Sequence, residues 1–112
     1  MLPRFDLPIF SLEIVSGDDG FTTVSVSGEL DLASASEFSS AVQTALGTGS
    51  VAIDLQRVSF MDSAGVKALN TALREAEEHG RQLRICGRMQ PSVVQILELT
   101  GMMGLLPTED RC

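Results

Sequence analysis

The chain has 112 residues but only one histidine, and this scarcity excludes the common catalytic serine site. A Ser-His-Asp triad would have to use His79. If one helix carries both Ser63 and His79, about 24 Å separates them at ~1.5 Å per residue. That distance is too long for proton transfer. The sequence also contains no Gly-x-Ser-x-Gly segment, Walker loop or histidine-rich metal motif. We therefore predict no catalytic residue, no metal site and no cofactor.

Cysteine and long apolar runs are equally scarce. The two cysteines, Cys86 in an apolar segment and Cys112 at the last position, have neither Cys-x-x-Cys nor metal-ligand spacing. We expect a buried thiol and a tail thiol, both reduced. No apolar run approaches the ~18 residues that a membrane-spanning helix needs, and the first residues lack a signal-peptide pattern. The expected location is the cytoplasm, without membrane insertion.

Basic residues are few. The chain has 8 basic and 15 acidic residues, a net charge of −7, and Lys67 is its single lysine. Direct binding of nucleic acid or anionic lipid depends on basic patches, so neither is expected. The hydrophobic fraction of 44% is typical of a globular domain. We predict an N-terminal arm at residues 1–10, which contain two prolines, and one domain at residues 11–112.

Hydrophobic periodicity predicts a mixed sheet with helices. Two strands, Leu12–Ser16 and Phe21–Ser27, are joined by the turn at residues 17–20 as an antiparallel hairpin. Further strands are predicted at Val51–Leu55, Leu83–Cys86 and, as a short last strand, Leu105–Leu106.

The helices alternate with these later strands. A capping-box pattern at Ser34–Glu37 begins the first helix, which ends at Gly47. The second follows Ser63, has an apolar stripe of Val66, Leu69, Leu73 and Ala76, and ends near His79 and Gly80. The third begins at Pro91 and ends near Gly101. The predicted fold is α/β, an α+β sandwich with four to five strands, three to four helices and the order ββαβαβα(β).

The segment Asp62-Ser63-Ala64-Gly65 stands where the central strand gives way to the second helix. The start of a helix has unpaired backbone N–H groups and a partial positive charge. Asp62 or Ser63 can cap these groups, or the Ser63 hydroxyl can accept a phosphate. Both interpretations stay open on spacing alone. His79, beside Gly80, is expected to complement the carbonyl groups at the other end.

Asp54 in the central strand is a competing phosphate acceptor, of the kind found in receiver domains. That chemistry needs a lysine near the last strand, and no lysine follows Lys67. A hairpin also stands where a helix should separate the first two strands. Both observations count against Asp54.

Three segments together resemble the STAS domain family, specifically the single-domain bacterial anti-sigma factor antagonists. The first is Val26-Ser27-Gly28-Glu29-Leu30-Asp31, and the third is Leu83-Arg84-Ile85-Cys86-Gly87 followed by Pro91. The second and most specific is Val51–Leu55 followed by Val58-Ser59-Phe60-Met61-Asp62-Ser63-Ala64-Gly65. The resemblance covers about residues 12–108.

The resemblance implies a STAS-like sheet flanked by helices and a protein without enzymatic activity. The unphosphorylated form of such an antagonist binds a serine-kinase anti-sigma factor, which then releases a sigma factor. The kinase uses ATP to phosphorylate the serine that matches Ser63, which ends binding, and a serine phosphatase restores it. The family's motif often has a second serine directly after the first, and in this chain that position is Ala64. The implied partner-binding residues are Asp62, Ser63, Ala64, Gly65, Lys67 and Asp31.

Two alternatives remain at this point. The second hypothesis is a non-switching STAS subunit of a signalling scaffold or lipid-transport complex, in which Ser63 stays unmodified. A small-ligand or nucleotide-binding module is a weaker hypothesis, because no phosphate-binding loop supports it.

Overall fold

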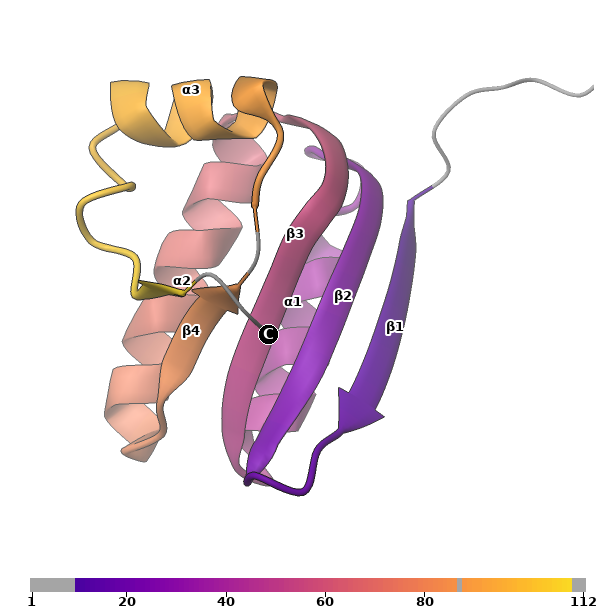
Figure 1. Cartoon of the computed structure of the whole chain (residues 1–112), viewed down its shortest axis with the longest axis vertical. Helices are drawn as coiled ribbons and strands as arrows, with labels where there is room; N and C mark the ends of the chain where they lie inside the picture. Colours follow the sequence, from indigo (N-terminus) through magenta and orange to yellow (C-terminus); the bar gives the residue numbers. More distant parts are fainter. Residues whose placement is uncertain (1–9, 87, 110–112) are drawn as a thin grey trace, which may run out of the picture.

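The computed structural model describes residues 10–86 and 88–109. These residues form the elements of Figure 1 in the predicted order. None of the helices in this part of the chain has the length and apolarity needed to cross a membrane. The strands are β1 (Ser11–Ser16), β2 (Phe21–Leu30), β3 (Ser50–Met61), β4 (Leu83–Cys86) and β5 (Thr108–Glu109), and the helices are α1 (Ala35–Leu46), α2 (Ser63–His79) and α3 (Pro91–Leu99).

The strands form one mixed sheet in the order β1-β2-β3-β4-β5. The pair β1–β2 is antiparallel, which confirms the predicted hairpin, and the other three pairs are parallel. A parallel connection requires a crossover, and α1, α2 and α3 provide the three crossovers. Helices α1 and α2 lie on one face of the sheet, while α3 lies across the end at which β4 finishes (Figure 1). The predicted fold class is confirmed.

The core lies between the sheet and the α1–α2 layer. Alternate residues of β2 and β3 point toward the helices and are buried, as the period of two in a strand requires. The largest fully buried side chains include Val24, Val26, Leu30, Ile53 and Leu55 from the strands and Phe38, Val42 and Leu46 from α1.

The buried face of α2 matches the predicted stripe only in part, at Leu69 and Ala76. Val66 and Leu73 are only half-buried, whereas Ala68 and Ala72 are buried with Leu69. The reason is that α2 packs against α1 as well as against the sheet. The buried face is therefore turned toward α1, where alanines allow the two helices to approach closely.

Several boundaries differ from the prediction. β2 continues to Leu30 and β3 to Met61, because their pairing resumes after two register shifts instead of ending at the first irregularity. The predicted strand at Leu105–Leu106 is wrong. The backbone N–H groups of both residues donate to the Met102 carbonyl oxygen in a turn, so they are not available to a sheet. The last strand pairs Thr108 with Ile85 instead.

Two predictions concern residues that the structure does not describe. Of the predicted arm at residues 1–10, residues 1–9 lie outside the described part, and Phe10 is half-buried against the core. Cys86 is buried as predicted, but it is not a reduced thiol, since the structure has it in a disulfide. Cys112 also lies outside the described residues.

Candidate functional site at the start of α2

The site is built where β2 and β3 end side by side. Leu30 is the register partner of Met61, and the Asp62 N–H donates to the Leu30 carbonyl oxygen at 3.3 Å. Asp31 and Asp62 therefore follow neighbouring parallel strands, and Ser63 begins α2. Loops at the carboxyl ends of parallel strands are the usual place for ligand and partner contacts in such sheets.

Asp62 is the N-cap of α2. Its Oδ1 accepts hydrogen bonds from the backbone N–H groups of Ala64, at 2.9 Å, and Gly65, at 3.3 Å. Its backbone is extended, with φ −112° and ψ −169°, as an N-cap residue requires. Of the two capping interpretations, the structure therefore supports the one in which the aspartate is the cap.

Ser63 is exposed and is the first residue of α2. Its hydroxyl makes no hydrogen bond to any other residue in the described part of the chain. Because the Asp62 side chain already accepts from the N–H groups of Ala64 and Gly65, this hydroxyl is not needed for the helix cap. It remains available to solvent, beside the partial positive charge of the helix start.

Gly65 has a packing role. A Cβ atom at this position would lie 2.6 Å from the Leu30 carbonyl oxygen and 2.6 Å from Cγ of Met61. Only a residue without a side chain lets the start of α2 approach the end of β2 this closely. Gly65 is buried, whereas Ala64 is half-buried. The role of both residues in partner contact stays a prediction.

Asp31 is held in the loop after β2 by Ser34. The Asp31 N–H donates to Ser34 Oγ at 3.0 Å, and the Asp31 Oδ1 accepts from the Ala33 N–H at 3.0 Å. The Ser34 hydroxyl donates to the Glu29 carbonyl oxygen at 2.8 Å. The predicted capping box is therefore wrong, since the Ser34 side chain makes no cap hydrogen bond to α1. It fixes the loop that leads away from β2 instead.

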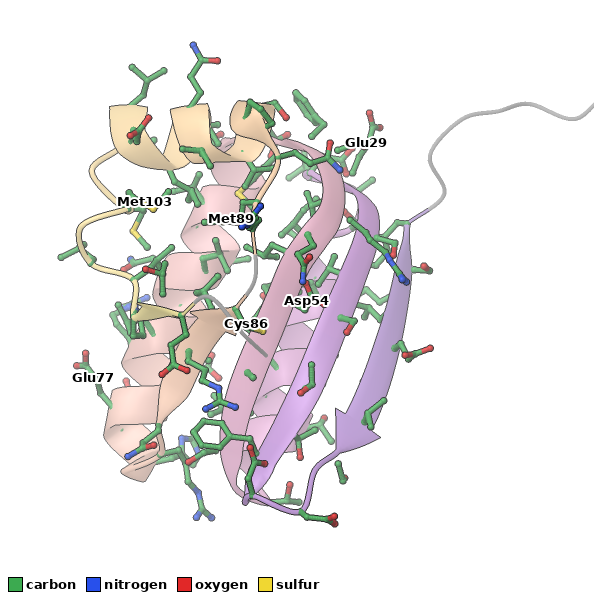
Figure 2. All side chains as sticks on the ribbon, in the orientation of Figure 1. Glu29, Asp54, Glu77, Cys86, Met89 and Met103 are labelled. Carbon is green, nitrogen blue, oxygen red and sulfur yellow. The ribbon has the colours of Figure 1, made fainter. Side chains whose placement is uncertain are left out.

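The competing candidates lie elsewhere. His79 is at the opposite end of α2 from Ser63, and its Nδ1 lies 2.8 Å from the Glu75 carbonyl oxygen. Asp54 lies at the middle of the sheet, on the face away from α1 and α2 (Figure 2), where its Oδ1 accepts from the Gln56 N–H at 2.9 Å. The described residues contain no cluster of acidic, histidine and cysteine side chains suited to a metal ion.

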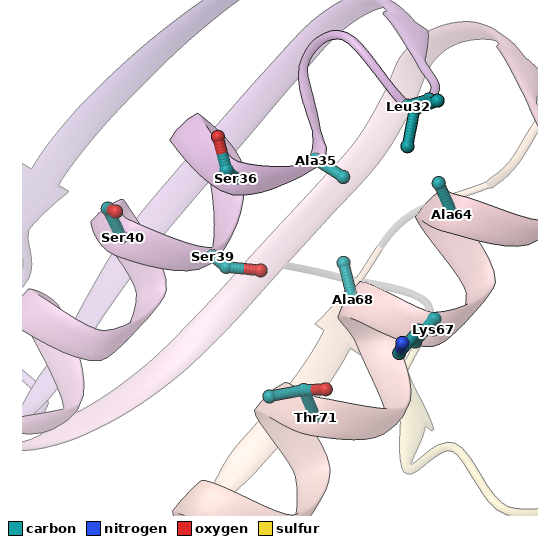
Figure 3. Close-up of a pocket in the computed structure, with 9 residues that line it drawn as sticks. All are labelled: Leu32, Ala35, Ser36, Ser39, Ser40, Ala64, Lys67, Ala68 and Thr71. Atoms are coloured by element: carbon teal, nitrogen blue, oxygen red, sulfur yellow. The ribbon is translucent and has the colours of Figure 1, made fainter.

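A groove that sequence reasoning missed opens between α1 and α2, and it is lined by Ala64, the residue after Ser63 (Figure 3). We call it the α1–α2 groove, and its volume is about 410 Å³. The groove is open because small residues spaced four apart line it on each helix. These are Ala35 and Ser39 on α1, and Ala64 and Ala68 on α2. This spacing is a signal that the sequence contains, but it points to a groove only once the two helices are known to be neighbours. The lining residues are Leu32, Ala35, Ser36, Ser39, Ser40, Ala64, Lys67, Ala68 and Thr71.

Comparison with known proteins assigns the fold. The family model described as the STAS domain matches residues 14–111. The chain belongs to the STAS domain family. The predicted resemblance is thereby confirmed, and the mixed sheet with helices on one face and across one end is this family's fold in the present chain.

Several individual proteins are similar to this chain over most of their length. An anti-sigma-B factor antagonist from Staphylococcus aureus is 29% identical over 90 residues, which cover 79% of this chain and 82% of that protein. The crystal structure of an anti-sigma factor antagonist from Mycobacterium paratuberculosis has a TM-score of 0.78 at 25% identity, covering 89% of this chain and 85% of that one. The Bacillus cell fate determinant SpoIIAA in its phosphorylated form has a TM-score of 0.65 at 23% identity, covering 90% and 91%.

Proposed function

We propose that this STAS domain is an anti-sigma factor antagonist. Its unphosphorylated form binds a serine-kinase anti-sigma factor, which then releases a sigma factor. The kinase phosphorylates Ser63 with ATP and so ends binding, and a serine phosphatase reverses the modification. In this proposal the domain acts in the cytoplasm by binding alone, with no catalytic activity and no contact with nucleic acid or membrane. The proposed contact residues are Asp62, Ser63, Ala64, Gly65, Lys67 and Asp31.

The observation that carries the proposal is the division of roles between two adjacent residues. Asp62 caps α2, and the Ser63 hydroxyl is exposed and has no hydrogen bond within the described residues. A protein kinase has to take the acceptor hydroxyl into its own active site. A serine that is free of structural bonds allows this without loss of the helix cap. The names of the similar proteins from Staphylococcus and Mycobacterium support the same role.

The electrostatics explain how one phosphate can act as a switch. Phosphorylation adds about 1.5–2 negative charges beside Asp62 and Asp31. A partner surface that fits a neutral serine would then bury an uncompensated anion. Such a change costs several kcal/mol, and about 2.7 kcal/mol already lowers affinity a hundredfold. The domain itself tolerates the phosphate, because the start of a helix favours an anion.

The test is phosphorylation followed by binding. The protein is incubated with candidate serine-kinase anti-sigma factors and ATP, and the modified residue is located by mass spectrometry. We expect phosphate on Ser63, no labelling of Ser63→Ala, and normal labelling of Ser16→Ala, which removes an exposed serine at the end of β1. Ser63→Ala should still bind the kinase, and Ser63→Asp should bind it less well.

The alternative function predicts a different result. If Ser63→Asp binds every candidate kinase as tightly as the parent protein does, the phosphoswitch is the wrong model. A stable multi-subunit complex that co-purifies with the protein would then indicate a non-switching STAS subunit of a signalling scaffold or lipid-transport complex.

A further inference from the structure

The α1–α2 groove combines an apolar surface with a single charge. Lys67 is the one charged residue among those that line it, and the others are apolar or carry small hydroxyl or methyl groups. Lys67 is exposed and has no ion pair within the described part of the chain. In a protein with a net charge of −7, this leaves an unpaired cation beside an apolar cavity.

No acidic group of the domain competes for this cation inside the groove. Two carboxylates near the start of α2, those of Asp62 and Asp31, already accept hydrogen bonds from backbone N–H groups. The groove is therefore complementary to a ligand with an apolar part and a negative charge. A peptide segment with an aliphatic side chain next to an aspartate or glutamate has this chemistry.

Lys67 is also placed to respond to Ser63. The two residues are four apart on α2, so their side chains lie on the same face one turn apart. Side chains on a helix lean toward its N-terminus, so a lysine at position 67 can bring its ammonium group to a charged group at position 63. An acidic group four residues before a lysine is the favourable order for an ion pair. A phosphate on Ser63 would create this pair.

We propose that the α1–α2 groove binds an aliphatic side chain of the partner, and that Lys67 pairs with a carboxylate next to it. A phosphate on Ser63 forms an ion pair with Lys67 within the domain, so Lys67 no longer pairs with the partner's carboxylate. The inference rests on the proposed function and adds the chemistry of the partner segment and a second way in which the phosphate acts.

The first experiment measures binding of the unphosphorylated protein to the serine-kinase anti-sigma factor that binds the parent protein. Ser39→Leu fills the groove and should weaken binding about tenfold or more, and Lys67→Gln about fivefold. Lys67→Arg should keep most of the affinity. Matched controls lie outside the groove on the same helices: Thr44→Leu on α1 and Arg74→Gln on α2 should bind within about twofold of the parent.

Thermal unfolding of each variant separates lost binding from lost folding. Ser39 is half-buried, whereas Lys67 is exposed, so Lys67→Gln tests the inference even if Ser39→Leu is destabilised. Equal binding by the parent, Ser39→Leu and Lys67→Gln would overturn the inference and leave the proposed function intact. If the parent binds no such kinase, the proposed function fails and the inference fails with it.

The second experiment needs no partner. Phosphoserine is incorporated at position 63 during synthesis, and its second ionisation is followed by ³¹P NMR. The nearby Lys67 ammonium should hold the pKa of the phosphate lower than in Lys67→Gln by about 0.3. Asp62 and Asp31 are present in both proteins, so their effects cancel, and Arg74→Gln should match the parent. The same pKa in the parent and Lys67→Gln would refute the pairing.

Discussion

Replacing Gly65 by alanine is the sharpest test of how the start of α2 is positioned. The new Cβ would lie 2.6 Å from a backbone oxygen, that of Leu30, and 2.6 Å from Cγ of Met61. Ordinary contacts begin near 3.4 Å, so the helix start and the end of β2 would have to separate by about 0.8 Å. The Leu30 carbonyl also accepts the Asp62 N–H at 3.3 Å, a hydrogen bond that this movement would lengthen.

The magnitude follows from two opposing effects. Inserting a methyl group into a packed position typically costs about 1–3 kcal/mol. Alanine recovers at most about 1 kcal/mol of helix propensity relative to glycine, and less in the first turn. We therefore expect Gly65→Ala to lower the free energy of unfolding by about 1–2 kcal/mol.

Urea denaturation followed by circular dichroism measures this change, and an m-value equal to that of the parent shows that only the stability has changed. Gly104→Ala is the matched control, because the nearest heavy atom to its Cβ would be 4.0 Å away and no clash results. Its free energy of unfolding should stay within about 0.5 kcal/mol of the parent. If Gly65→Ala is as stable as the parent, the close approach of α2 to β2 is not a constraint and the reasoning is refuted.

Two further substitutions test the bonds around the site. Asp62→Ala removes the cap of α2 and should lower the free energy of unfolding by about 1 kcal/mol, while Asp62→Ser should recover most of it; equal stability of all three proteins would show that the cap contributes nothing. Ser34→Ala leaves the Glu29 carbonyl without its hydrogen bond and should cost about 1–2 kcal/mol in the same assay. Ser36→Ala, on the exposed side of α1, should change stability by less than about 0.5 kcal/mol, and a loss equal to that of Ser34→Ala would contradict this assignment.

Local patterns were sufficient wherever neighbouring residues decide the conformation. The turn at residues 17–20 predicted the β1–β2 hairpin, and Pro91 marked the first residue of α3. Gly80 ends α2 in the left-handed conformation at φ 64°, as the sequence indicated. The Asp-Ser-Ala-Gly segment likewise marked the start of α2, because capping involves residues only two or three positions apart.

Local patterns failed where distant segments decide the outcome. Ser34 had the spacing of a capping box, but the Glu29 carbonyl at the end of β2 lies within reach and takes its hydroxyl. Hydrophobic periodicity ends β2 and β3 too early, because strand pairing continues across two irregularities. The position of the last strand depends on its pairing with β4. Arg84 on β4 also forms ion pairs with two residues far apart in the sequence, Asp19 and Glu109.

The sequence by itself determined the order of elements and the family, and it predicts Ser63 as the phosphate acceptor. Only the tertiary structure decided that Asp62, and not Ser63, caps α2, since that depends on where each side chain points. The packing of α1 against α2 likewise forms the groove beside Lys67. The close approach of Leu30, at the end of β2, is the reason why position 65 has no room for a side chain. The physical reason is that capping and turn formation are local, whereas grooves and close approaches arise from contacts between segments that the chain folds together.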